Sequence, residues 1–290
     1  MKKILVSILS AVVTAFLISG SLTLLSHNNV VGSSNTPPSP PPQFPIPPPS
    51  QPELSATQRS ASINQTCRLT PSLIEVEGTP QQIEGPYFVD DMPNRSDIRS
   101  DTSSGSAQEG IPLHLILHVY DVNEIDGDGT GSCTPLKDAK VDIWHSNSQG
   151  VYSGVRDDGT AGSDFLRGYQ MTDNNGTVGF TTVYPGWYEG RAIHIHVKVR
   201  TYEGSNETLE WTSQFYLNNS INELVHTQPP YSNHGSVPMT NEEDFIYTGP
   251  STDGLVKANT GQHLLLNPDE EGPGYTTTFN IGLNASQSGQ

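Results

Sequence analysis

The chain has 290 residues, with 31 acidic against 14 basic side chains and a formal net charge of −17 at pH 7. Phosphate backbones repel a chain this acidic, which argues against nucleic acid as a partner. The same charge repels anionic small molecules at long range and so favours a neutral ligand over a carboxylated one.

Residues 1–27 form the first predicted segment, which is a signal peptide or a membrane anchor. Lys2 and Lys3 give a basic start, and residues 4–25 are apolar apart from Ser, Thr and Gly. The length is near the ~20 residues that span a bilayer, so it fits both readings. Either reading predicts an exported protein, secreted or attached to a membrane, with the rest of the chain outside the cytoplasm.

Residues 28–60 form a predicted linker that is rich in Pro, Ser and Asn, with runs at 40–42 and 47–49 that contain proline alone. Such runs favour an extended polyproline spacer. Nothing else in the segment marks a docking motif, so we expect an unstructured spacer without a partner of its own.

Residues 61–290 suffice for one domain with a sizeable core. Strand-like runs recur over 113–120, 139–144, 178–183, 193–200, 209–217 and 276–281. Apolar residues alternate along the first of these runs, as in a strand with one face in the core. Turn-like connections such as 173–176 separate the runs, and no long stretch has a strong helical period. The predicted fold class is all-β, a single β-sandwich of mainly antiparallel strands.

The two cysteines are Cys67 and Cys133. An even number of cysteines in an exported chain favours a disulfide over free thiols. Neither residue has a Cys or His neighbour at a metal-ligand spacing. We therefore predict a bridge between Cys67 and Cys133.

A His-x-His pair lies in the predicted strand 193–200. Side chains alternate along a strand, so His194 and His196 project from the same face as two parallel imidazoles. Such a pair can bind a metal ion, although paired histidines also occur as ordinary half-buried or surface residues.

Two tyrosines upstream of this pair favour the hypothesis of a metal site. A phenol gives up its proton when its oxygen coordinates a hard, highly charged cation. Two phenolates and two neutral imidazoles suit iron(III) better than zinc, which usually takes Cys, His or carboxylate. The candidates are Tyr152 and Tyr188, for each of which core packing is the alternative in a chain with 11 tyrosines.

Several motifs occur together in one order along the chain. They are Glu-Gly-Pro-Tyr at 84–87, Val-Asp-Ile-Trp-His-Ser-Asn-Ser-Gln-Gly-Val-Tyr-Ser at 141–153, Phe-Leu-Arg-Gly at 165–168, Pro-Gly-Trp-Tyr at 185–188 and Arg-Ala-Ile-His-Ile-His at 191–196. In this order they resemble the intradiol ring-cleavage dioxygenases, which include catechol and protocatechuate dioxygenases. The resemblance covers roughly residues 65–220.

The resemblance implies a set of iron ligands. Tyr152 matches the tyrosine that closes the Trp-His motif, and Tyr188 matches the second tyrosine, after the Pro-Gly turn. His194 and His196 match the family's His-x-His pair. Because the second tyrosine of the family leaves the iron when substrate binds, Tyr188 is also expected to act in catalysis.

Two further residues match the family's active-site positions. Arg191, three residues before the first histidine, is expected to stabilise charge that develops on the substrate, with Gln214 adding a hydrogen bond. The separation between His196 and Gln214 is longer than in the cytosolic catechol enzymes, so an insertion over 202–209 has to be looped out. The alternatives are a surface pair of Arg191 with Glu189 and an ordinary strand residue at Gln214.

The implied function is that of an exported non-haem dioxygenase with Fe(3+) as its cofactor. It would cleave catechol-type rings with O2 between the two hydroxyl-bearing carbons and give cis,cis-muconate-type products. The alternatives are a non-catalytic exported β-sandwich module that binds polyphenol or polysaccharide, and a copper or zinc protein that uses the same histidines. The helical dimerisation region of the catechol enzymes has no counterpart in the sequence, so their quaternary structure is not expected.

Overall fold

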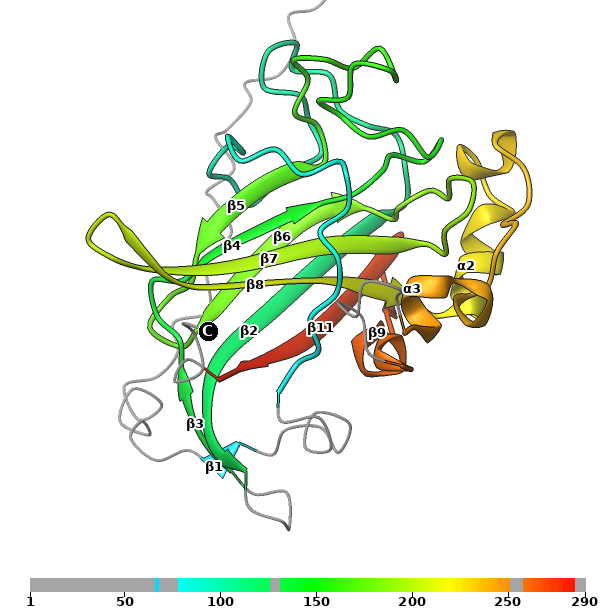
Figure 1. Ribbon diagram of the computed structural model, residues 1–290. Coiled ribbons are helices and arrows are strands. Elements are labelled where there is room, and N and C mark those ends of the chain that lie inside the picture. The colour runs from blue at the N-terminus through cyan, green and yellow to red at the C-terminus, as the bar shows by residue number, and fades with distance from the viewer. Residues whose placement is uncertain (1–65, 68–77, 126–130, 251–257, 285–290) are drawn as a thin grey trace, which may run out of the picture. The chain divides into compact units, whose positions relative to one another are not determined.

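The computed structural model describes residues 66–67, 78–125, 131–250 and 258–284 (Figure 1). All of them belong to one compact unit, Leu54–Gln290. The predicted signal or anchor at 1–27 and the predicted linker at 28–60 lie outside the described residues. Within the described ranges, no helix has the length and apolar character needed to cross a bilayer.

The described residues form two β-sheets. The first contains β1 (Thr66–Cys67), β2 (Pro112–Ile125), β3 (Gly131–Pro135), β6 (Thr177–Val183), β10 (Asp269–Glu271) and β11 (Gly274–Leu283). Its centre is β2, which pairs antiparallel with β6 along its first half and with β3 along its second half. The other edge of β2 pairs with β11, and this pairing is parallel.

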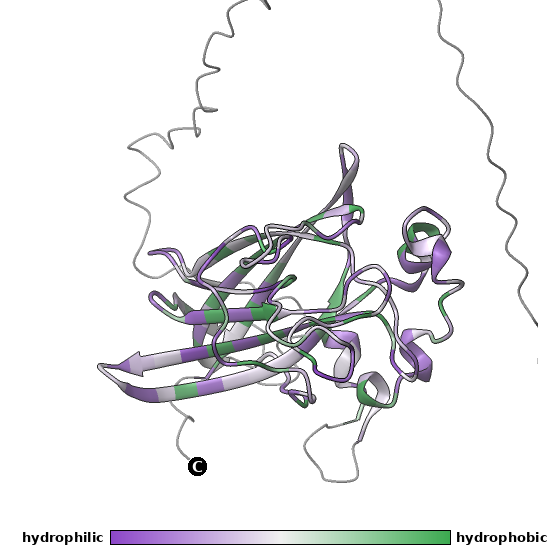
Figure 2. Ribbon diagram, turned by 90° about the horizontal axis from the view of Figure 1, so that it is seen from above, coloured by the Kyte–Doolittle hydropathy of each residue, from purple (hydrophilic) through white to green (hydrophobic). Residues whose placement is uncertain are grey.

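The second sheet carries the residues of the candidate site. Its strands are β4 (Lys140–Trp144), β5 (Arg167–Met171), β7 (His194–Glu203), β8 (Asn206–Leu217) and β9 (Leu265–Leu266), in the order β5-β4-β7-β8-β9. All of its pairings are antiparallel except β8 with β9. The long β7–β8 hairpin, whose tip is hydrophilic, extends beyond the rest of the sheet (Figure 2).

The two sheets pack on one shared core. Alternate residues of β2 and β7 lie in a single buried cluster: Leu113, Leu115, Leu117, Val119, Ile195, Val197 and Val199. Each such side chain contributes about 1.5–3 kcal/mol when it is fully buried. The period of two in both strands therefore directs one face of each sheet into the sandwich.

The predicted all-β class is confirmed, with two differences. Both sheets are mixed, because β11 and β9 each run parallel to a neighbour. Short helices that the sequence did not indicate also occur: α2 (Asn219–His226), α3 (Phe245–Thr248), and the 3-10 turns η2 (Tyr231–Asn233), η3 (Asn241–Glu243) and η4 (Thr260–Leu264). Figure 1 shows α2 and α3 beside one end of β8.

An extended segment, residues 79–95, covers the outer face of the second sheet; we call it the covering segment. It bonds to β8 at Thr212 and Gln214, pairs ionically with Lys198 and Arg200 of β7, and reaches β5 at Tyr169. Because of this cover, β7 is buried on both faces from His194 to Arg200. The outer face thus becomes an enclosed polar layer.

The predicted disulfide lies at the edge of the first sheet. β1 pairs antiparallel with β3, with Cys67 opposite Gly131, two residues from Cys133 in sequence. Cys133 is buried, and the side chain of Cys67 is outside what the structure describes, so the bridge stays a prediction. Closing a loop of this length stabilises the fold by about 3–5 kcal/mol.

Mass analysis of unreduced protein made in an oxidising compartment should find both thiols blocked, and the reduced protein should take up two alkyl groups. Two cysteines that alkylate freely before reduction would contradict the bridge.

Candidate metal centre and active site

The four predicted ligands come from three places around the second sheet. Tyr152 lies on the connection from β4 to β5, and Tyr188 lies on the connection from β6 to β7. His194 and His196 are the first and third residues of β7. Trp144 of β4 pairs with His196, and its indole stacks on that imidazole at 4.8 Å, which fixes the ring plane.

The structure brings these four side chains together. The Nε2 atoms of His194 and His196 are 3.1 Å apart, and Tyr188 Oη is 3.2 Å from His194 Nε2. The Tyr152 ring lies 5.6 Å from that of Tyr188 and 6.0 Å from that of His196. Two phenols and two imidazoles therefore converge on one place.

A backbone contact sets the orientation of His194. Its Nδ1 lies 2.7 Å from the carbonyl oxygen of Ala192, so Nδ1 carries the proton and donates it. Nε2 then presents a lone pair toward Tyr188 and His196. A carbonyl in this role is the usual outer support of a metal-binding histidine.

Tyr152 has an unsatisfied oxygen. Its side chain is 1% exposed, and its hydroxyl makes no hydrogen bond of acceptable geometry within the described residues. A buried hydroxyl without a partner costs about 1–3 kcal/mol. A cation between the four side chains would use this oxygen, so the residues present fit a metal ion.

The protonation states point to the kind of ion. Burial lowers the pKa of His194 and His196 well below the ordinary value, so both imidazoles are neutral and can donate lone pairs. Burial also raises the pKa of both Tyr152 and Tyr188, so only a strongly charged cation would convert these phenols to phenolates. Within the described ranges no three His, Cys, Asp or Glu residues cluster to hold a metal, so a cation at this place would need the tyrosine oxygens beside the two imidazoles. A hard trivalent cation suits this donor set.

Arg191 and Gln214 lie together beside the histidines. Gln214 stands opposite His196 in the β7–β8 ladder and accepts a 2.6 Å hydrogen bond from Arg191 Nη2. The insertion at 202–209 is not looped out: its residues lengthen the β7–β8 hairpin at the end away from His194, with pairs such as Tyr202 with Glu207 and one register shift between Thr201 and Tyr202. Gln214 therefore keeps its place next to the site.

The ionic partner of Arg191 is Asp244, so the surface pair with Glu189 is wrong. Asp244 is fully buried, and its Oδ2 accepts from Arg191 Nε and from the Ala192 amide, each at 2.8 Å. Its Oδ1 accepts from Ile246 N and caps α3. Sequence reasoning missed Asp244; a cap before a short helix was its only local signal, and that signal does not indicate a partner 53 residues away.

We expect Asp244→Asn to lower the free energy of unfolding by about 3–5 kcal/mol, because it leaves the buried Arg191 charge without its counter-ion. Turnover should fall as well, since Arg191 loses its anchor. Asp90→Asn is the matched control: Asp90 also pairs with an arginine, Arg200, but its side chain is 70% exposed. Urea unfolding should separate the two variants, and equal small losses in both would contradict the role of Asp244.

The covering segment forms one wall of the site. The Tyr87 ring stacks on that of Tyr152 at 4.5 Å and lies edge-on to that of Tyr188 at 6.3 Å. Gly85 lies against His196, so a Cβ there would be 3.3 Å from the imidazole Cε1 and would require a backbone φ of +77°. The Glu-Gly-Pro-Tyr motif thus has a structural reason: glycine allows close approach and the tyrosine packs on a predicted ligand.

Comparison with known proteins gives a consistent assignment. The family model described as Dioxygenase matches residues 83–236, more than half of the chain. A chlorocatechol 1,2-dioxygenase of Cupriavidus pinatubonensis is 30% identical over 172 residues, which cover 53% of this chain and 60% of that protein. A catechol 1,2-dioxygenase of Acinetobacter baylyi is 35% identical over 111 residues, or 38% of this chain and 32% of that protein.

Among solved structures, an intradiol ring-cleavage dioxygenase from Tetranychus urticae is 30% identical, with a TM-score of 0.57. The match covers 73% of this chain and 96% of that one. By contrast, this chain spans less than two thirds of the length of either curated relative. The family match, the shared fold and the order of the motifs agree, and the chain belongs to the intradiol ring-cleavage dioxygenase family.

Proposed function

We propose that the protein cleaves catechol-type rings with O2 between the two hydroxyl-bearing carbons and releases cis,cis-muconate-type products. A ferric ion held by Tyr152, Tyr188, His194 and His196 would be the cofactor. The observation that carries the proposal is the convergence of two neutral imidazole nitrogens with a buried, unsatisfied phenol and a second phenol. An exported location, with or without membrane attachment, is part of the proposal and rests on residues 1–27 of the sequence.

The two tyrosines differ in burial, which supports different roles. Tyr152 is buried beneath Tyr87, whereas Tyr188 is half-buried and lies on a connection beside the exposed Gly190. When bound, a ferric ion would supply Lewis acidity and a template for the two catechol oxygens. Tyr188, nearer to solvent, is the phenol whose place a substrate oxygen would take, and its oxygen would accept a substrate proton.

Arg191 and Gln214 lie beside the four predicted ligands, where they would stabilise negative charge on the substrate. Arg191 is held by Asp244 and Gln214, and Gln214 in turn donates to the Ile83 carbonyl at 2.8 Å. These contacts orient the guanidinium before substrate binds. A fixed cation in a buried site stabilises negative charge that develops on the ring without reorganising during the reaction.

The electrostatics favour a catechol without a carboxylate. Arg191 is already paired with Asp244, and the nitrogens of the buried Arg167 are bonded to Ser153 and Tyr87. Neither arginine is free to bind a substrate carboxylate, and the net charge of −17 repels anions at long range. Protocatechuate should therefore be a poorer substrate than catechol.

Anaerobic titration of the iron-loaded protein with catechol and protocatechuate, followed by admission of O2, tests the proposal. We expect red-brown protein, a colour change with catechol, and one O2 consumed per muconate-type product formed. The zinc-loaded protein should be colourless and inactive. Binding of catechol or polysaccharide without O2 uptake by the iron-loaded protein would instead indicate a non-catalytic module.

A further inference from the structure

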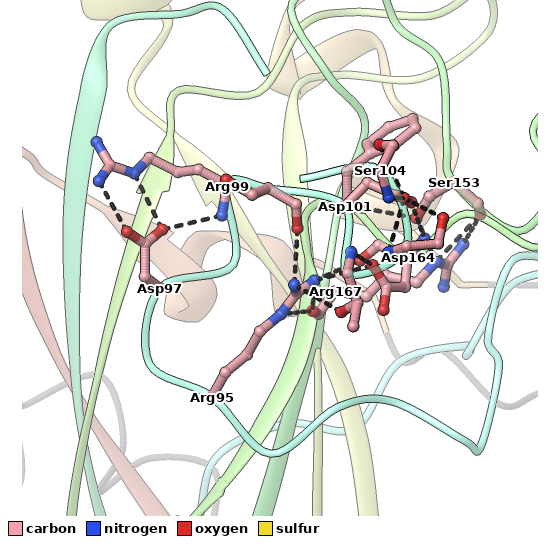
Figure 3. A network of polar contacts seen from close by, with 12 residues as sticks. Arg95, Asp97, Arg99, Asp101, Ser104, Ser153, Asp164 and Arg167 are labelled. Carbon is pink, nitrogen blue, oxygen red and sulfur yellow. Dashed lines mark hydrogen bonds and ion pairs between the residues drawn. The ribbon is translucent and has the colours of Figure 1, made fainter. Parts of the chain in front are cut away.

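Arg167 is a buried cation with an unusual set of partners. It begins β5, directly after the loop that carries Tyr152, and is 2% exposed. Its Nε donates to the Ser153 hydroxyl at 2.8 Å and to the Ser153 carbonyl at 3.1 Å, and its Nη2 donates to the same carbonyl. Its Nη1 donates to the carbonyl of Tyr87. Figure 3 shows the guanidinium of Arg167 bonded to Ser153.

The other cations buried around the second sheet have carboxylate partners. Arg191 pairs with Asp244, Lys198 with Glu84 and Glu210, and Arg200 with Asp90 and Asp142. No ion pair in the described part of the chain includes Arg167. Burial lowers its pKa to about 10, so it still carries its charge at neutral pH. An unpaired buried charge is costly, which calls for a functional explanation.

Tyr152 is a group close to Arg167 that can become an anion. The guanidinium carbon of Arg167 lies 6.0 Å from the centroid of the Tyr152 ring. Two carbonyls accept hydrogen bonds from Arg167. One belongs to Ser153, which follows Tyr152 in the chain, and the other to Tyr87, whose ring stacks on Tyr152. The charge is therefore fixed to the backbone on both sides of this phenol.

We propose that Arg167 is a positioning residue that locks Tyr152 in place and acts as the counter-charge of its phenolate when Tyr152 ligates iron. The proposal rests on the proposed function of the site. It accounts for the missing carboxylate, because an acidic partner would cancel the charge that the phenolate needs. A fixed cation near a ligand lowers the energy of its anionic form and so strengthens metal binding.

Two substitutions separate charge from geometry. Arg167→Lys keeps a cation in the same space but loses the planar fork, whereas Arg167→Gln keeps hydrogen-bond donors and loses the charge. Arg95→Gln is the matched control. Arg95 also bonds to backbone carbonyls, those of Ser100, Asp164 and Arg167, but it has an acidic neighbour in Asp164 at 3.5 Å. Figure 3 shows Arg95 beside Arg167 and Asp164.

Three readouts of the full chain test the proposal: the phenolate-to-iron charge-transfer band, the rate of iron loss to a chelator, and the rise in melting temperature on iron loading. In Arg167→Gln the band should move to longer wavelength, because the phenolate becomes a better electron donor. Iron loss should be about 10-fold faster or more, as for other outer-shell changes. The iron-dependent rise in melting temperature should shrink. Arg167→Lys should keep the parent band position. Arg95→Gln should lower the melting temperatures of the iron-free and the iron-loaded protein equally.

An unshifted band and parent-like iron retention in Arg167→Gln would overturn the proposal, as would an equal shift in Arg167→Lys and Arg167→Gln. If Arg167→Gln does not fold, the lysine variant decides: a parent-like band supports the charge role and a displaced band overturns it. A parent protein that binds no iron and has no such band would instead defeat the proposed function.

Discussion

Replacing His194 or His196 with Ala is expected to remove most of the bound iron and, with it, the activity. Each change deletes one of the four predicted protein donors, and the described residues contain no cluster of three or more His, Cys, Asp or Glu that could hold the ion instead. Loss of a ligand should exceed the ~10–100-fold loss of metal affinity that follows the loss of an outer-shell partner. Iron content of protein purified from the same expression, measured by elemental analysis, tests this directly.

His226→Ala is the matched control for the histidine variants. His226 is also buried, but its Nδ1 bonds to the Asn222 carbonyl within α2 and not to a predicted ligand. This variant should lose some stability, because its ring packs on Tyr184 and Tyr231, and should keep its iron. Near-stoichiometric iron with retained turnover in His194→Ala or His196→Ala would refute their assignment as ligands.

Local pattern was sufficient to predict the strands that build the core and the residues that converge. The alternation in β2 and β7 has a period of two, and this period alone places Leu113 and Leu115 in the core. It also puts His194 and His196 on one face of β7, because they are two residues apart. The positions of Tyr152 and Tyr188 came from motifs in a fixed order, since spacing by itself does not bring two loops together.

The features that local sequence pattern did not predict depend on contacts between residues far apart in the chain. β5 is five residues long and contains Arg167 and Gly168, so it has no apolar alternation; its pairing with β4 makes it a strand. β7 is buried on both faces from His194 to Arg200, because the covering segment lies on its outer face and supplies Glu84 and Asp90 to its cations. Asp244 also contacts Arg191 through tertiary packing, which brings the start of α3 to the connection just before β7.

Replacing Tyr188 with Phe and replacing Tyr152 with Phe are expected to have different effects on turnover and on the spectrum. Tyr188→Phe should still bind catechol, because a substrate oxygen takes the place of the lost phenolate. Its turnover should fall roughly 100-fold or more, since the group that accepts a substrate proton is gone. Tyr152→Phe should instead alter the spectrum of both the resting protein and the substrate complex. Tyr152 is 1% exposed, stacks on Tyr87 and lies 6.0 Å from Arg167, so we expect it to stay in place.

Stopped-flow spectra of both variants, mixed anaerobically with catechol, measure this difference. Tyr184→Phe is the control, because it also removes a buried phenol, one that donates to Asn222 and not to the site; its spectra should match the parent's. In the parent, one charge-transfer band should vanish when catechol binds, and Tyr188→Phe should lack that band from the start. If the band that vanishes is missing from Tyr152→Phe instead, the roles of the two tyrosines are reversed. If neither band responds to catechol, substrate does not displace a tyrosine, and the asymmetry in burial between Tyr152 and Tyr188 has no catalytic meaning.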